Sequence, residues 1–126
     1  MTSQPIVHID FPAHDPAIMS KFYGSVFNWK IQAFPEYDYY TFQGESGPGG
    51  GFPRFGGSNA VQAREVLVYI NSADIEADLA RIEAAGGQAL TSKIEIGGGM
   101  GFYAFFQDPA GNRVALYTDG APAAGG

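Results

Sequence analysis

The residues best suited to proton or metal chemistry stand near the start of the chain, in the stretch IVHIDFPAHD at residues 6–15. His8 lies on an expected strand, and Asp10 follows on the same face because strand side chains alternate between two faces. A carboxylate at this spacing can change the proton affinity of an imidazole. The sequence leaves open the alternative that Asp10 is a solvated carboxylate at a strand edge. His14 falls at the expected turn into a helix, where we expect it to be exposed.

Other kinds of site find little support in the residue types. The chain contains no cysteine, which excludes disulfides, thiolate metal sites and cysteine nucleophiles. The glycine clusters GPGGGF and GGGMGF lack the residues of a phosphate-binding loop, so we expect hairpin turns and a glycine-rich edge strand there. No G-x-S-x-G motif is present, which argues against a serine hydrolase.

Two helices are expected, and both must pack against the strands that hold these residues. In DPAIMSKFYGSVFNW, Asp15 is a good N-cap and Pro16 takes the first helical position. The following apolar residues recur at the helical period, so we expect them to form one buried face. They are Ile18, Met19, Phe22, Tyr23, Val26 and Phe27.

The second helix is expected in SADIEADLARIEAAGG. Ser72 or Asp74 caps its start, and Gly86 ends it. Its apolar positions are Ile75, Leu79, Ile82 and Ala85. Strands are expected before each helix, at IVHIDF and EVLVYI, and after them at WKIQAF, DYYTF, QALTSKIEI, GFYAFFQ and NRVALYT.

The two halves of the chain repeat one pattern. VHIDFPAHD aligns with VLVYINSAD at an offset that places Asp15 against Asp74, and each is a strand, a turn and a helix cap. The sequence therefore predicts an α+β fold of two β-α-β-β-β modules, at about residues 5–55 and 63–118. The glycine-rich segment between them is a natural junction, with a short strand expected at GGFPRF. We expect one domain over residues 1–118 and a flexible tail at 119–126.

Composition limits the partners. The net charge is −6, which argues against nucleic acid and against anionic membranes. The N-terminus lacks the pattern of a secretory signal, and no apolar run approaches the ~20 residues that span a bilayer. We therefore expect a cytoplasmic protein.

Four stretches that together span nearly the whole chain carry a family resemblance. They are VHIDFPAHDPAIMSKFYGSVFNWKI, GPGGGF, VYINSADIEADLARIEAAGGQAL and GFYAFFQDPAGNRVALYT. The chain resembles the vicinal-oxygen-chelate superfamily of glyoxalases, bleomycin-resistance proteins and dioxygenases, and within it the small proteins related to lactoylglutathione lyase. This resemblance implies that the two modules form a U-shaped, half-open β-barrel with the helices outside and a cleft inside. It also implies a homodimer.

The resemblance also implies where a metal would bind. Metal-dependent members hold a divalent ion with side chains from four strands, and His8 matches the first position. Leu67 and Ala115 stand where two further ligands would be, and neither side chain can bind a metal. Glu95 lies on a separate strand. We therefore predict no metal and no cofactor.

Strand alternation sorts the side chains that would face the cleft. Val7, Ile9 and Phe11 are assigned to the helix side, and Phe106 to the core. Phe52, after the glycine run, is expected to close one end of the cleft. The predicted ligand-binding residues are His8, Asp10, Phe52, Tyr69, Tyr103, Phe105 and Tyr117.

Three functions follow in order of preference. The first is a protein that binds a small, flat or amphipathic molecule in an aromatic cleft without a metal. The second is a lyase, isomerase or dioxygenase-like enzyme in which His8 is the general acid or base. The third is a metalloenzyme with an atypical site built from His8 and residues not placed here, some of them from a dimer partner. The sequence leaves open whether the protein is an enzyme.

Overall fold

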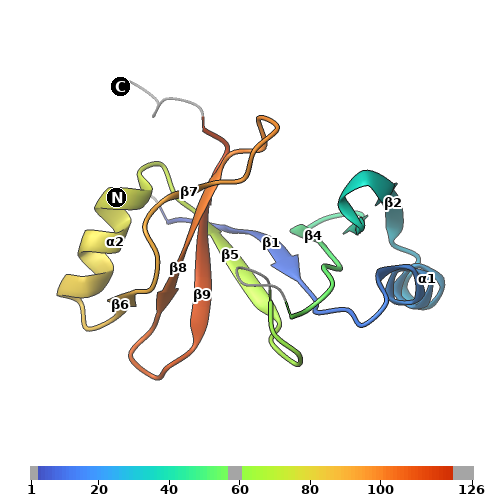
Figure 1. Ribbon diagram of the computed structural model, residues 1–126, viewed down its shortest axis with the longest axis horizontal. Coiled ribbons are helices and arrows are strands. Elements are labelled where there is room, and N and C mark those ends of the chain that lie inside the picture. The colour runs from blue at the N-terminus through green and yellow to red at the C-terminus, as the bar shows by residue number, and fades with distance from the viewer. Residues whose placement is uncertain (1–2, 57–60, 121–126) are drawn as a thin grey trace. The chain divides into compact units, whose positions relative to one another are not determined.

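The computed structural model describes residues 3–56 and 61–120, and its class is α+β (Figure 1). The chain divides into two compact units at Val68 and Tyr69. The first module is Ile6–Val68, and the second module is the chain from Tyr69 onward together with the residues before Ile6. The predicted tail at 119–126 lies, from residue 121, outside the described residues.

The first module has the predicted β-α-β-β-β order. Its elements are β1 (Ile6–Asp10), α1 (Pro16–Phe27), β2 (Lys30–Phe34), a 3-10 turn η1 (Pro35–Tyr37), β3 (Tyr39–Gln43) and β4 (Gly49–Gly51). The strands form a sheet in the order β2-β3-β4-β1. β4 runs parallel to β1 and antiparallel to β3.

The second module repeats this order with one strand broken in two, β6 and β7 (Figure 1). Its elements are β5 (Leu67–Asn71, which begins in the last two residues of the first module), α2 (Ile75–Ala84), β6 (Gln88–Ala89), β7 (Ile94–Glu95), β8 (Phe102–Gln107) and β9 (Arg113–Thr118). β6 and β7 both pair with β8, β8 pairs antiparallel with β9, and β9 pairs parallel with β5. The predicted α+β class and the two β-α-β-β-β modules are therefore confirmed.

The first helix starts as predicted but presents a different face to the core. Asp15 accepts hydrogen bonds from the backbone N–H groups of Ala17 at 3.0 Å and Ile18 at 3.4 Å. Met19 and Tyr23 pack against the core of the first module, as predicted. The other four predicted core positions are exposed, which corrects that part of the prediction: Ile18, Phe22, Val26 and Phe27.

Small residues explain this reversal. Ser20 is buried, and a Cβ on Gly24 would lie 3.0 Å from the Ile31 side chain. The side of α1 that approaches the sheet most closely therefore carries a serine and a glycine. Large side chains at i, i+4 and i+8 point elsewhere on the helix surface. The helical periodicity of the sequence identifies a row of apolar residues, but it does not show which side of the helix packs against the sheet.

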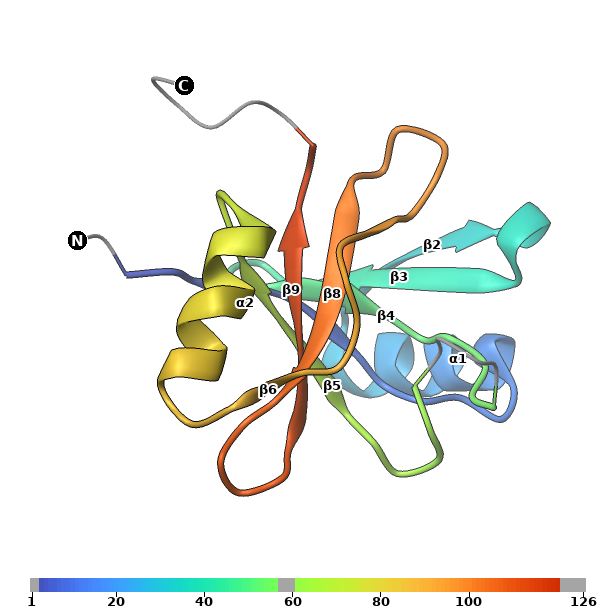
Figure 2. The same ribbon diagram turned by 60° about the vertical axis from the view of Figure 1, so that its left-hand side comes forward.

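The second helix covers its sheet in the expected way. Ile75 and Leu79 pack against Ala104 and Leu116, with α2 along one face of β8 and β9 (Figure 2). Asp74 is the N-cap, since its side chain accepts the backbone N–H of Ala77 at 3.1 Å. Ser72, the other predicted cap, instead donates to Asp78 Oδ2 at 2.6 Å. Gly86 ends the helix at a φ of 104°. The predicted apolar residue Ala85 is exposed.

The central glycine run forms an inner strand of the first module. We expected a glycine-rich edge strand, but β4 lies between β3 and β1. A Cβ on Gly50 would overlap the carbonyl of Ile9 and the ring of Phe42. A Cβ on Gly51 would overlap the phenol of Tyr39. Glycine is required here because neighbouring groups occupy the space of a side chain, not because of a turn.

Candidate functional site

The first module gathers three polar side chains on the sheet face opposite its aromatic core. His8 Nε2 lies 2.7 Å from Asp10 Oδ1. The Tyr39 hydroxyl donates to Asp10 Oδ1 at 3.0 Å and lies 3.1 Å from His8 Nε2. The Asp10 side chain is 9% exposed and the His8 side chain is 31% exposed. Asp10 is therefore a nearly buried carboxylate within a hydrogen-bonded group, not a solvated edge residue.

Backbone register explains how Tyr39 reaches Asp10. Asp10 pairs with Gly51 across β1 and β4, and Gly51 pairs with Thr41 across β4 and β3. Tyr39 is two residues from Thr41, so both project from the same face. Since Gly51 has no side chain, the ring of Tyr39 can lie across β4 and bring its hydroxyl to the carboxylate.

This arrangement defines the chemistry open to His8. With Asp10 ionised, the Nε2–H of the imidazole donates to the carboxylate, and so does the Tyr39 hydroxyl. Nδ1 is then the ring nitrogen that can accept a proton. A carboxylate that accepts from one nitrogen holds the ring in one orientation and one tautomer. The group can therefore serve as a general base or acid, or as a polar contact.

The second module presents an aromatic face on the side opposite α2. Strand pairing sets out two rows across β5, β9 and β8. One row is Tyr69, Ala115 and Phe105, and the other is Asn71, Tyr117 and Tyr103. The rings of Tyr103 and Phe105 lie 5.2 Å apart, at 56°. Phe106 packs on the helix side, as predicted, so the alternation predicted for β8 is confirmed.

Hydroxyl groups and a guanidinium make this aromatic face partly polar. The Tyr117 hydroxyl donates to the backbone carbonyl of Met100 at 2.8 Å. The guanidinium carbon of Arg113 lies 4.2 Å from the centre of the Phe105 ring, within cation–π distance. The two aromatic residues Tyr69 and Tyr103 are partly exposed, whereas Phe105 is 2% exposed. Phe105 therefore lies under the face, and the tyrosines lie at its surface.

Both tyrosine hydroxyls are less acidic than usual. Burial raises the pKa of Tyr103 above its ordinary value of 10.0, and the nearby charge of Arg113 partly offsets this. Burial, followed by the negative charge of Asp119, raises the pKa of Tyr117. Because the pKa of each group is raised, both phenols stay protonated at neutral pH and can donate hydrogen bonds.

The structure places the predicted site residues in three different settings. His8 and Asp10 are brought together, and Tyr69, Tyr103, Phe105 and Tyr117 share one face of the second module. Phe52 is placed differently. It is fully buried in the helix-side core of the first module, with its ring 5.4 Å from Tyr23 and 5.2 Å from Phe42. The end of a cleft is therefore not where this side chain lies.

Sequence reasoning missed two residues of these clusters, Tyr39 and Arg113. Both could be found by strand parity. Tyr39 shares a face with Thr41, and Arg113 shares a face with Ala115 and Tyr117. The alternation of side chains along one strand could not show that the glycine strand β4 lies between Tyr39 and Asp10.

The donor set does not fit the metal site that the resemblance implied. In the part of the chain that the structure describes, no group of three or more His, Asp or Glu side chains could hold a metal ion. Leu67 and Ala115 are apolar and almost fully buried. His14 is exposed on its turn, as expected, and Glu95 is exposed on β7. His8 and Asp10 alone are fewer donors than Zn²⁺ requires.

Comparison with known proteins gives a consistent family. Residues 5–116 match the Glyoxalase/Bleomycin resistance protein/Dioxygenase superfamily. A glyoxylase-like domain-containing protein of Didymella fabae is 32% identical over 118 residues, which cover 87% of this chain and 90% of that protein.

Solved structures show the same fold at low sequence identity. A methylmalonyl-CoA epimerase in complex with methylmalonyl-CoA and NH4+ is 18% identical, with a TM-score of 0.67 over 97% of this chain and 99% of that one. A superfamily member from Vibrio splendidus 12B01 is 14% identical, with a TM-score of 0.61 over 92% of this chain and 100% of that one.

Proposed function

This chain belongs to the Glyoxalase/Bleomycin resistance protein/Dioxygenase superfamily, and from that premise we propose that it binds a small, flat or amphipathic molecule without the metal used by many relatives. The observation that carries the proposal is the aromatic face of the second module. Tyr69, Tyr103 and Tyr117 combine ring surface with hydroxyl groups, and Arg113 adds a cation. Such a mixture suits a ligand whose flat body is apolar and whose edge is polar.

A fluorescent naphthalene sulfonate dye is a suitable first probe because it is flat and amphipathic. We expect saturable binding at micromolar dye, with Tyr103→Ala and Tyr69→Ala each weakening it by roughly 2- to 10-fold, the value of one aromatic contact. Tyr37→Ala is the matched control, since Tyr37 is 60% exposed and belongs to the first module rather than to the strands that form this face. Equal binding by all four proteins would show that the dye does not use the aromatic face. Screening a compound panel by thermal shift then identifies natural ligands.

Absence of a metal requirement is a separate part of the proposal. It is supported by the two-donor set at His8 and by the apolar residues Leu67 and Ala115. Elemental analysis of purified protein, before and after dialysis with zinc, nickel or manganese, tests it. A stoichiometric ion that survives dialysis would contradict this part.

A second candidate function is acid–base catalysis by His8. It is favoured by the Asp10 and Tyr39 contacts, which hold the imidazole in place beside a carboxylate and a hydroxyl group. The methylmalonyl-CoA epimerases that share this fold are isomerases, one of the reaction classes open to such a residue. Once a turned-over substrate is found, His8→Ala should abolish turnover while His14→Ala, a change at an exposed histidine, should not. Full turnover by His8→Ala would rule out this role.

The assembly and location of the protein belong to the same proposal. We propose a homodimer in the cytoplasm, related to the lactoylglutathione-lyase subgroup, with no nucleic acid or membrane partner. The net charge of −6 supports the last point. None of the helices in the described residues is long and apolar enough to cross a bilayer. Sedimentation and cell fractionation test the assembly and the location.

A further inference from the structure

Two tyrosines of the aromatic face have hydroxyls in different settings. Tyr103 and Tyr117 pair across β8 and β9, and the Tyr117 hydroxyl donates to the backbone carbonyl of Met100 at 2.8 Å. No described residue hydrogen-bonds to the Tyr103 hydroxyl, whereas every buried side-chain oxygen or nitrogen in residues 3–56 and 61–120 has a partner. The Tyr103 hydroxyl is therefore open at the surface, and its proton is available to a ligand.

Tyr117 has a different role, because it ties β9 to the hairpin between β7 and β8. Its ring reaches the hairpin beside Gly101, where a Cβ would lie 3.0 Å from the Tyr117 hydroxyl and would overlap the carbonyl oxygen of Thr118. Gly101 has a φ of 102°, and residues 97–99 are three further glycines at positive φ. Glycine backbone is the least restricted of all. The bond to Met100 therefore gives a fixed point to a hairpin with little stiffness of its own.

The hairpin continues the aromatic face with an apolar edge. Ile94 pairs with Tyr103, and the Ile96 N–H donates to the Gly101 carbonyl at 2.9 Å, which continues the same register. Paired residues of antiparallel strands lie on one face, so Ile94 and Ile96 share the face of Tyr103. Ile96 is 40% exposed. A ligand on the Tyr103 ring would therefore meet an apolar edge whose position depends on the Tyr117 bond.

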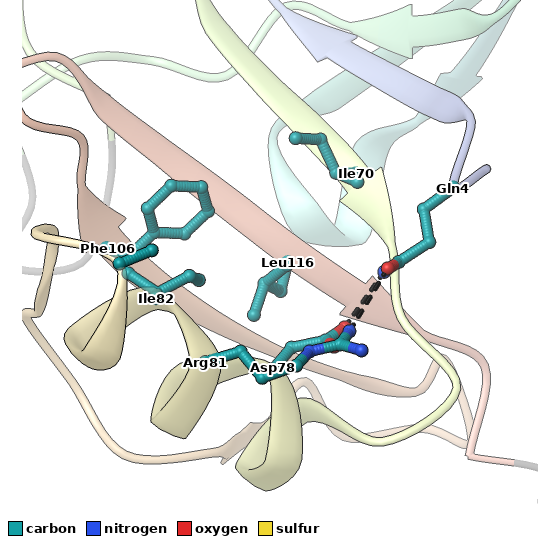
Figure 3. Close-up of a pocket in the computed structure, with 8 residues that line it drawn as sticks. Gln4, Ile70, Asp78, Arg81, Ile82, Phe106 and Leu116 are labelled. Carbon is teal, nitrogen blue, oxygen red and sulfur yellow. Dashed lines mark hydrogen bonds and ion pairs between the residues drawn. The ribbon is translucent and has the colours of Figure 1, made fainter. Parts of the chain in front are cut away.

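The groove beside α2, on the helix side of the same sheet, offers a different kind of surface (Figure 3). Its volume is about 270 Å³, and most of its lining is apolar. At its polar end the Asp78 carboxylate accepts hydrogen bonds from Gln4 at 2.8 Å and Ser72 at 2.6 Å. Arg81 pairs with the same carboxylate. These polar groups bind one another, so a ligand that needs a hydrogen-bond donor is better matched to the open hydroxyl of Tyr103.

We propose that the ligand is a flat aromatic carbonyl compound, oriented with its carbonyl oxygen at the Tyr103 hydroxyl and its apolar end against Ile96. A conjugated carbonyl oxygen lies in the plane of its ring, so it can accept from the hydroxyl while the ring stays over the aromatic face. Tyr117 is then a positioning residue, because it acts on the ligand through the hairpin that carries Ile96. This inference rests on the small-molecule binding proposed above and names the class of ligand.

The dye prodan, a flat naphthalene ketone, is the probe, and fluorescence titration of the full chain measures its Kd. Tyr103→Phe keeps the ring and removes the donor, so it should raise the Kd by roughly 2- to 10-fold. Naphthalene itself has no acceptor, and as a competitor it should bind both proteins equally. Ala85→Trp is the control, because it fills the groove beside α2 and leaves the aromatic face unchanged. Loss of binding in this variant would place the dye in the groove and overturn the inference.

Amide exchange tests the positioning role without any ligand. Tyr117→Phe should speed the exchange of the Ile96 N–H by roughly 5-fold, because the hairpin loses one hydrogen bond. It should also weaken prodan binding, but add nothing in an Ile96→Ala background, since Tyr117 acts through that side chain. Equal losses of affinity in both backgrounds, or an unchanged exchange rate, would overturn this role.

The remaining outcomes separate the class of ligand from the proposed function. An unchanged prodan Kd in Tyr103→Phe would overturn the carbonyl contact. Binding of the naphthalene sulfonate dye but not of prodan would overturn the carbonyl ligand and keep the proposed function. Failure of both dyes to bind the wild type would overturn the proposed function as well.

Discussion

The two modules share one strand order but differ in what their open sheet faces carry. At the offset of the internal repeat, Asp10 corresponds to Tyr69, and each pairs with a residue of the middle strand. The middle residues are Gly51 and Ala115. In the first module a polar group forms across the glycine. In the second module aromatic rings flank the alanine.

The two middle residues differ by one methyl group. Without a Cβ at Gly51, the ring of Tyr39 crosses the middle strand to reach Asp10. At the corresponding position of the second module, Ala115 carries a Cβ and is paired with Tyr69 and Phe105 in the strand register. The same backbone thus supports hydrogen-bonded chemistry in one copy and ligand-stacking surface in the other.

Gly51→Ala should have the largest effect, because it makes the first module resemble the second at this position. The new Cβ overlaps Tyr39, so we expect a loss of about 3 kcal/mol in the free energy of unfolding, measured with urea. The reverse change, Ala115→Gly, should cost only about 1 kcal/mol. Combining Gly51→Ala with Tyr39→Ala should recover part of the loss, since it removes the overlapping ring. Equal costs for the two single changes would contradict the comparison.

Tyr39→Phe should remove the polar link while keeping the ring. One hydrogen bond to the nearly buried Asp10 is lost, so the free energy of unfolding should fall by about 1 kcal/mol. Tyr37→Phe is the control, because Tyr37 is largely exposed. If the two variants unfold at the same urea concentration, the hydroxyl of Tyr39 does not stabilise the first module.

High pH should weaken the second module through its tyrosines. The folded pKa values of Tyr103 and Tyr117 are raised above 10.0, so the unfolded chain loses these protons first as pH rises. The two neutral tyrosines therefore contribute fully to the free energy of unfolding below pH 10. This contribution is lost as the pH rises through their pKa values in the folded protein. Urea midpoints should fall between pH 9 and pH 11. A Tyr103→Phe, Tyr117→Phe variant should show a shallower fall than the wild type; an identical fall would show that other groups cause it.

The smallest effect is expected at two exposed carboxylates, one from each module. The hydrogen bond from Arg54 lowers the pKa of Asp38, and hydrogen bonds from Asn112 lower that of Asp108. Each lowered pKa adds to the free energy of unfolding above pH 3.8, and this stabilisation is lost as the pH falls through the pKa of the folded state. In an NMR titration, Arg54→Met should return Asp38 to its ordinary range and leave Asp108 unchanged. A shift at both would show that the change spreads beyond the ion pair.

Local sequence patterns predicted the parts of the fold that depend on one segment at a time. The caps at Asp15 and Asp74, the two module repeats and the pairing of His8 with Asp10 follow from spacing along one helix or strand. Tyr39 was missed because its contact depends on a neighbouring strand. Phe52 was misplaced and the burial of Phe22 was wrong for the same kind of reason: which face is covered depends on residues distant in sequence.

Strand β4 sets a minimum side-chain length for the polar group of the first module. It separates β1 from β3 by two strand spacings, roughly 10 Å, and contributes no side chain of its own. Of the two residues on the open face of β3, Thr41 is too short to cross this distance, whereas Tyr39 is long enough. Two other side chains at positions 10 and 39 whose lengths together span this distance would change the chemistry of this face without altering the backbone. The glycine strand therefore makes this half of the protein a practical starting point for redesign.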